Sequence, residues 1–101
     1  MTLPRLIHLD YYFKIVHKVR ENIYEMRTHK GECVFEMDAD TMSAIVYKHI
    51  PGAKKGYWTN DGAAYLAASN MDSLFFKCKV AATSRGWDAN RLMQFIYIFE
   101  Q

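Results

Sequence analysis

The segment from Gly86 to Gln101 constrains the fold of this chain more than any other part of the sequence. Trp87 and Asp88 open it, and between residues 92 and 99 the only polar residue is Gln94; the others are Leu92, Met93, Phe95, Ile96, Tyr97, Ile98 and Phe99. A helix on a protein surface keeps a polar face toward water, and this segment has almost none. We therefore expect it to be buried on several sides, inside its own domain or against another molecule.

The length and composition predict one globular domain that spans residues 1–101. A chain of 101 residues normally builds a single core, because a second core would be too small to be stable. Half of the residues are apolar and 24% are charged, which is typical of a folded soluble chain. The net charge of +2 is too small to indicate a polyanionic partner by itself.

The two cysteines, Cys33 and Cys78, indicate the cellular setting. A secreted domain that depends on disulfides usually has more cysteines. The sequence Met-Thr-Leu-Pro-Arg at the start lacks the apolar core of a signal peptide, and no apolar run approaches the ~20 residues that cross a bilayer. We expect a cytoplasmic protein whose two thiols are free and buried.

The first third of the chain predicts a helix and a hairpin. Pro4 suits the first position of a helix, and apolar residues recur at helical spacing up to about residue 20: Leu6, Leu9, Phe13 and Val16. Segments 23–27 and 32–37 are rich in β-forming residues and flank a short loop with Gly31, which is typical of a β-hairpin. The alternative is a helix that continues to Thr28, but it would be longer than ~35 Å and exceed the width of a compact domain.

A second helix is predicted over residues 42–50. Asp38 or Asp40 can cap it, and its apolar spacing comes from Met42, Ile45, Val46, His49 and Ile50. Pro51 and Gly52 end it. Residues 51–62 form the longest predicted loop.

The remainder is predicted to be helical from Ala63, with a break near Ser69, where Ser69 and Asp72 fit a capping box. The next helix has one apolar stripe: Met71, Leu74, Phe75, Cys78, Ala81 and Ala82. Gly86 closes it in a left-handed conformation, and Asp88 caps the last helix. A buried strand is the alternative for 92–99. The fold class is thus a mainly helical α+β domain, in the order helix, β-hairpin, helix, loop, helix pair and apolar aromatic C-terminal helix.

The search for catalytic and metal-binding motifs predicts a protein that is not an enzyme and needs no cofactor. The chain has no phosphate-binding loop, no nucleophile-elbow pattern and no pair of histidines at metal-ligand spacing. Glu36, Asp38 and Asp40 alternate and could share one face of a strand around a hard cation. The calcium-loop pattern is incomplete, however, so we interpret Asp38 and Asp40 as helix caps and expect no metal.

The best candidate for a binding element is the loop with Lys54, Lys55, Tyr57 and Trp58. Lysines neutralise phosphates and flat rings stack on unpaired bases, so this combination suits single-stranded nucleic acid. Trp and Tyr also dominate the centres of protein interfaces. The alternative is that both rings fold back into the core.

These observations predict a small, non-enzymatic cytoplasmic protein that binds a larger protein partner, as accessory and inhibitor proteins of phages and mobile elements do. The first alternative is a nucleic-acid-binding module that uses the basic-aromatic loop, and the second is a metal-dependent enzyme. No membrane association is expected. Because one face cannot easily cover the C-terminal helix, we also expect a homodimer, with Phe95, Ile96 and Phe99 in the core or at the seam.

Overall fold

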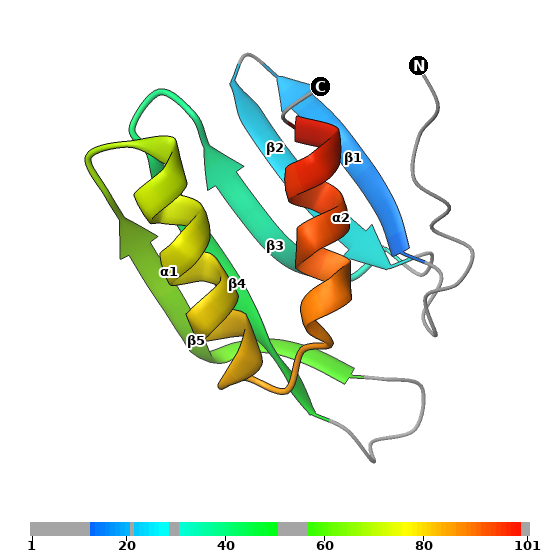
Figure 1. Cartoon of the computed structure of the whole chain (residues 1–101). Coiled ribbons are helices and arrows are strands. Elements are labelled where there is room, and N and C mark those ends of the chain that lie inside the picture. Colours follow the sequence, from blue (N-terminus) through cyan, green and yellow to red (C-terminus); the bar gives the residue numbers. More distant parts are fainter. Residues whose placement is uncertain (1–12, 21, 29–30, 51–56, 100–101) are drawn as a thin grey trace.

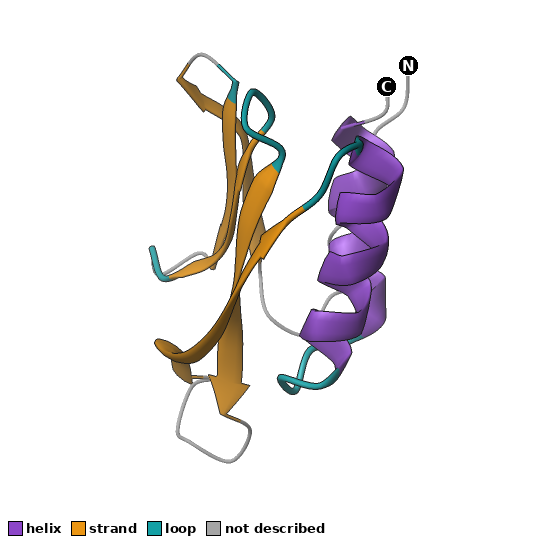
Figure 2. Cartoon of the chain, turned by 90° about the vertical axis from the view of Figure 1, so that its left-hand side faces the viewer, coloured by secondary structure: helices purple, strands orange, loops and turns teal. Residues whose placement is uncertain are grey.

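The protein is a two-layer domain in which a pair of helices covers one face of an antiparallel sheet (Figures 1 and 2). The computed structural model describes residues 13–20, 22–28, 31–50 and 57–99. Five strands precede two helices: β1 Phe13–Arg20, β2 Ile23–Thr28, β3 Cys33–Asp38, β4 Ser43–Ile50, β5 Tyr57–Ala67, α1 Met71–Thr83 and α2 Ala89–Phe99. The sheet order β1-β2-β3-β4-β5 follows the chain, so neighbouring strands are consecutive in sequence.

Side-chain alternation along the strands builds the face that the helices cover. Phe35 and Met37 of β3 are fully or almost fully buried, and they pair with the buried Val46 and Ala44 of β4. Cross-strand partners lie on the same face of a sheet, so these residues form a continuous apolar floor. The opposite face carries the polar and half-buried residues between them.

The helices divide this floor between them. α1 lies over β4 and β5, whereas α2 lies over the first strands of the sheet (Figure 1). Phe95 of α2 contacts Phe35 of β3, with ring centroids 5.0 Å apart, and Tyr24 of β2 at 6.5 Å. Phe75 of α1 contacts Phe99 of α2 at 5.5 Å, which joins the two helices. One chain therefore covers the apolar side of its last helix.

The prediction of a mainly helical domain is wrong. Residues 42–50 and 63–67 were predicted to be helical, but Ser43–Ile50 and Tyr57–Ala67 are strands. The predicted first helix also fails over Phe13–Arg20, which is β1, while residues 4–12 lie outside the described residues. Over a short window, the apolar residues of these segments fit both the helical period of 3.6 residues and the strand period of two. Pairing with a neighbouring strand decides in favour of the strand.

Other predicted elements are confirmed. β2 and β3 form the hairpin that the sequence predicts around Gly31, and 71–82 is helical, as is the segment 92–99. The N-cap of α1 is Asn70 instead of Ser69: its side-chain oxygen accepts a hydrogen bond from the Ser73 amide at 2.8 Å. Within the described residues, no helix is long and apolar enough to cross a bilayer.

Candidate functional site

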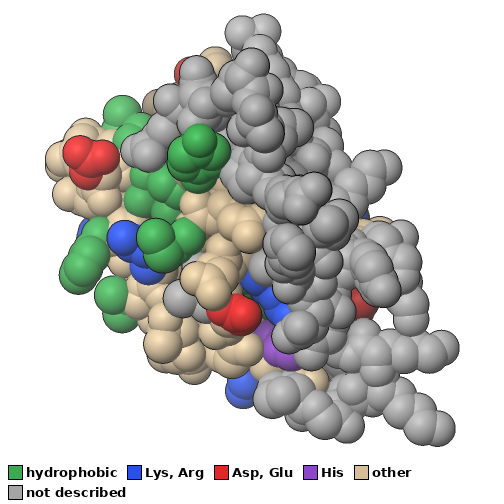
Figure 3. All heavy atoms as spheres, turned by 45° about the vertical axis from the view of Figure 1, so that its right-hand side comes forward, with side chains coloured by type: hydrophobic (Ala, Val, Ile, Leu, Met, Phe, Trp, Pro, Cys, Tyr) green, Lys and Arg blue, Asp and Glu red, His purple; other side chains and the backbone are tan. Residues whose placement is uncertain are grey.

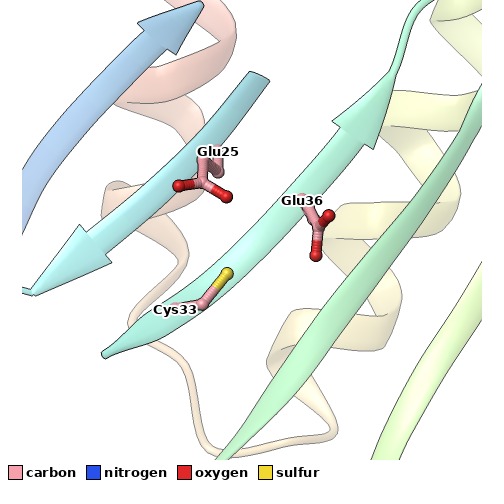
Figure 4. A group of neighbouring side chains, drawn as sticks. All are labelled: Glu25, Cys33 and Glu36. Atoms are coloured by element: carbon pink, nitrogen blue, oxygen red, sulfur yellow. The ribbon is translucent and has the colours of Figure 1, made fainter. Parts of the chain in front are cut away.

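The open face of the sheet presents a cluster of two carboxylates and a thiol. A bulge sets it up: Met26 pairs with Phe35 but Arg27 pairs with Cys33, so β3 carries one extra residue between these pairs. The extra residue brings Cys33 close to Glu25 and Glu36 on the same two strands (Figure 4). One ligand atom from each of these three side chains lies within 4.8 Å of the others.

The charges of this cluster are only partly compensated. Glu25 and Glu36 are direct cross-strand partners, and like charges in this arrangement repel. Arg27 offsets one of them, since its Nε donates a hydrogen bond to Glu25 Oε1 at 2.5 Å. This hydrogen bond is the main reason that the pKa of Arg27 is raised. Among the described residues, Glu36 has no ion pair.

The thiol of this cluster is not an activated nucleophile. Burial is the largest cause that raises the pKa of Cys33, and the negative charges of Glu25 and Glu36 add to it. A thiol with a raised pKa stays protonated at neutral pH, and only the thiolate attacks or binds a metal strongly. Burial likewise raises the pKa of Cys78 to about 12. The charge of Arg27 lowers the pKa of Cys33, but burial and the two carboxylates outweigh it.

A divalent metal is the other ligand that these donor types could take. A sulfur and two carboxylates suit Zn²⁺, but the ion would have to displace Arg27 from Glu25 and a proton from Cys33. The alternative set from the sequence, Glu36, Asp38 and Asp40, does not form a group at metal-ligand distances within the described residues. Asp38 Oδ1 accepts hydrogen bonds from the Asp40 and Thr41 amides at 2.9 and 3.2 Å. Asp38 therefore stabilises the β3–β4 turn, which corrects its interpretation as a helix cap.

Beside the cluster lies a shallow depression in the open sheet face. Its volume is about 470 Å³, and the described residues that line it include carboxylates but no Lys or Arg. The lining residues come from β2, β3, β4 and β5: Ile23, Glu36, Met37, Asp38, Ser43, Ala44, Ile45, Tyr65, Leu66 and Ala67. Tyr65 stands at its side with 69% of its surface exposed. The depression thus combines a negative end with apolar and aromatic walls.

A second surface lies on the opposite side of the molecule, where the helices face away from the sheet. Phe76 and Val80 of α1 are 64% and 56% exposed, and Met93 and Tyr97 of α2 are 51% and 50% exposed. We call these four residues the helix surface. Figure 3 shows hydrophobic side chains gathered on the helical side of the molecule. This surface was not predicted from the sequence, although the i, i+4 pairs opposite each buried stripe could have indicated it.

Of the loop residues chosen from the sequence, the structure describes only Trp58 together with its side chain. Lys54, Lys55 and the side chain of Tyr57 lie outside the described residues. Trp58 is only 6% exposed, and its ring stacks on His49 with centroids 4.5 Å apart. A base could not reach its face without displacing His49, so Trp58 belongs to the core.

The C-terminal residues chosen from the sequence lie in or beside the core. Phe95 is fully buried, while Ile96 and Phe99 are partly buried against the core. They are covered by the sheet and α1 of the same chain, and this removes the reason for placing them at a dimer seam. A homodimer stays a prediction.

No protein-family model matches the chain, and no similar curated protein or solved structure is found. Functional inference therefore depends on the geometry and chemistry of the two surfaces.

Proposed function

We propose that this protein is a non-enzymatic domain that binds another, larger protein through the helix surface. The observation that carries the proposal is the exposure of four large apolar side chains on the outward side of α1 and α2. Together they expose roughly 400 Å² of mainly apolar surface, which is in the range of the largest and often functional patch on a monomer. The protein would act by occupying a surface of its partner, as accessory and inhibitor proteins do.

The four side chains form one surface because the two helices lie side by side and run in opposite directions (Figure 1). The contact between Phe75 and Phe99 fixes their relative level. Because the helices are antiparallel, a step forward along α1 corresponds to a step backward along α2. Phe76 therefore lies near the level of Tyr97, and one turn further Val80 lies near the level of Met93.

The composition of this surface fits a protein interface better than a solvated face. Aromatic residues and Met are enriched at interface centres, and charged residues are depleted there. α2 has a single basic residue, Arg91, which is 2% exposed and so is not part of this surface, and it has no acidic residue. The outward side of α2 thus lacks charge, and its exposure to water has a cost that a partner would remove.

The absence of enzymatic activity is part of the proposal. The thiols with raised pKa values support it, as does the use of Asp38 in a turn. A cytoplasmic location is also proposed, and the free state of Cys33 and Cys78 supports it.

The test compares two double variants with the same charge change. Val80→Glu/Met93→Glu places carboxylates in the centre of the helix surface, and Asn60→Glu/Ser69→Glu places them at exposed polar positions outside it, in β5 and in the loop before α1. Equal melting temperatures would show that both variants stay folded. Partner candidates are captured from a nuclease-treated lysate of the source cells, purified, and titrated with each variant by calorimetry.

We expect the first variant to weaken binding about thirtyfold or more, and the second to bind within about twofold of the wild type. Equal binding by both variants would overturn the proposal. Loss of all captured protein on nuclease treatment would instead support nucleic-acid binding. Sedimentation velocity of the protein alone measures its oligomeric state. A dimer that is lost in Val80→Glu/Met93→Glu would mean that the helix surface binds a second copy of this chain and not a larger partner.

A further inference from the structure

We propose that the depression on the open sheet face binds the guanidinium group of an arginine side chain from a partner polypeptide. This site lies on the other layer of the domain from the helix surface, so it does not depend on the function proposed above (Figure 2). Three properties of the described residues carry the inference: a carboxylate without an ion pair, a row of side chains that matches an arginine, and an internal example of the same pairing.

This carboxylate is Glu36. It faces Glu25 directly across β2 and β3, and the ion pair of Arg27 within the described residues is with Glu25, so Arg27 compensates Glu36 only at longer range. Asp38 lines the same depression two residues further along β3, on the same face as Glu36. A cation beside Glu36 would relieve repulsion from both neighbours, and none of the described residues that line the depression is cationic.

The row of side chains follows from the register of the sheet. Glu36 pairs with Ile45, and Ile45 pairs with Tyr65, so the three residues lie in line across β3, β4 and β5. Neighbouring strands are roughly 5 Å apart, which puts the carboxylate and the aromatic ring about 10 Å from each other along the row. The stem of an arginine can lie on Ile45 and Tyr65 while its guanidinium reaches Glu36.

The internal example is Arg27, whose guanidinium already binds Glu25 on the same face. The open carboxylate next to it thus offers the same chemistry to a group from outside. A guanidinium is preferred over an ammonium because it is planar, binds a carboxylate with two donors and stacks on a ring. A metal ion is less suited, because it would need the Cys33 proton to leave and the pKa of this thiol is raised.

The probe is N-acetyl-arginine methylamide, titrated into ¹⁵N-labelled protein and followed by NMR. The matched neutral probe is the corresponding citrulline derivative, which has nearly the same shape without the charge. We expect saturable shifts at the amides of Glu36, Asp38, Ile45 and Tyr65 with the arginine probe. The shifts should weaken with added salt, and the citrulline probe should bind at least about tenfold more weakly.

Two variants test the role of the carboxylate. Glu36→Gln should weaken arginine binding about tenfold or more, while Asp72→Asn, which removes an exposed acid in the first turn of α1, should leave it unchanged. Val80→Glu/Met93→Glu should also leave it unchanged, which separates this site from the helix surface.

Three outcomes would overturn the proposal. They are unchanged binding in Glu36→Gln, equal binding of the citrulline probe, and shifts spread over exposed acids throughout the molecule. A parallel titration uses Zn²⁺. If the arginine probe does not bind, and Zn²⁺ shifts the amides of Glu25, Cys33 and Glu36 in the wild type but not in Cys33→Ser, the cluster is a metal site instead.

Discussion

At the scale of single residues, Gly86 connects the helix layer to the sheet. Its φ angle is +81°, a region that residues with a Cβ rarely adopt. The chain on both sides of it is held against β4: the His49 amide donates to the Arg85 carbonyl at 2.9 Å, and Trp87 Nε1 donates to the Tyr47 carbonyl at 2.6 Å. A Cβ at Gly86 would lie 2.7 Å from the His49 carbonyl oxygen.

We therefore expect Gly86→Ala to lower the free energy of unfolding by about 1–3 kcal/mol, because it combines a strained backbone with a clash against fixed main chain. Gly31→Ala is the matched control. Its φ angle is +89°, but nothing lies within 4 Å of the added Cβ, so it should cost about 1 kcal/mol. Urea denaturation of both variants measures the difference. An equal or larger loss at Gly31 would show that the close approach to His49 is not important.

At the scale of elements, the two sides of α2 have different surroundings. Its inner side fills the space between the sheet and α1 with Phe95, which is 0% exposed and contacts rings of β2 and β3. Its outer side presents Met93 and Tyr97. The domain itself covers only the inner side of this almost entirely apolar helix. The apolar residues of the outer side form part of the helix surface.

Truncation of a Phe on the inner side and of one on the outer side should thus change the stability by very different amounts. Phe95→Ala should lower the free energy of unfolding by about 3–5 kcal/mol, because it leaves a cavity in a packed core. Phe76→Ala, the same chemical change on the outer side of α1, should alter it by less than about 0.5 kcal/mol. Thermal and urea unfolding test this pair. A large loss at Phe76 would mean that the helix surface is already covered within the protein.

At the scale of the whole molecule, the sequential sheet leaves β5 as an edge strand. An edge strand offers unpaired carbonyls to other chains. Two cationic side chains occupy such groups: Lys77 Nζ donates to the Ala67 carbonyl and Arg85 Nε to the Gly62 carbonyl, both at 2.8 Å. The helix layer therefore reaches over the edge and blocks part of it.

We expect Lys77→Ala to aggregate faster than the wild type on prolonged incubation, because it frees a β5 carbonyl and removes a charge from the edge. Lys79→Ala removes the same charge from the same helix, and no hydrogen bond to β5 is described for its side chain, so it should behave like the wild type. Light scattering and thioflavin T fluorescence at matched concentrations follow the process. If the two variants aggregate at one rate, net charge and not edge protection controls it.

The sequence by itself determined the elements whose signals are local. The hairpin around Gly31 follows from its turn residues, and α1 follows from an apolar stripe long enough to have one period. The caps at Asp88 and Gly86 depend only on neighbouring backbone groups, so they too could be predicted.

Only the tertiary structure decided the rest. Residues 43–50 and 57–67 are strands because each has a partner strand across which its side chains pack, and strand pairing cannot be read from a short apolar window. The Glu25, Cys33 and Glu36 cluster depends on a bulge, and the helix surface depends on which sides of α1 and α2 the sheet covers. A side chain becomes a site or a core residue through what lies opposite it in space, and that is a property of the folded molecule.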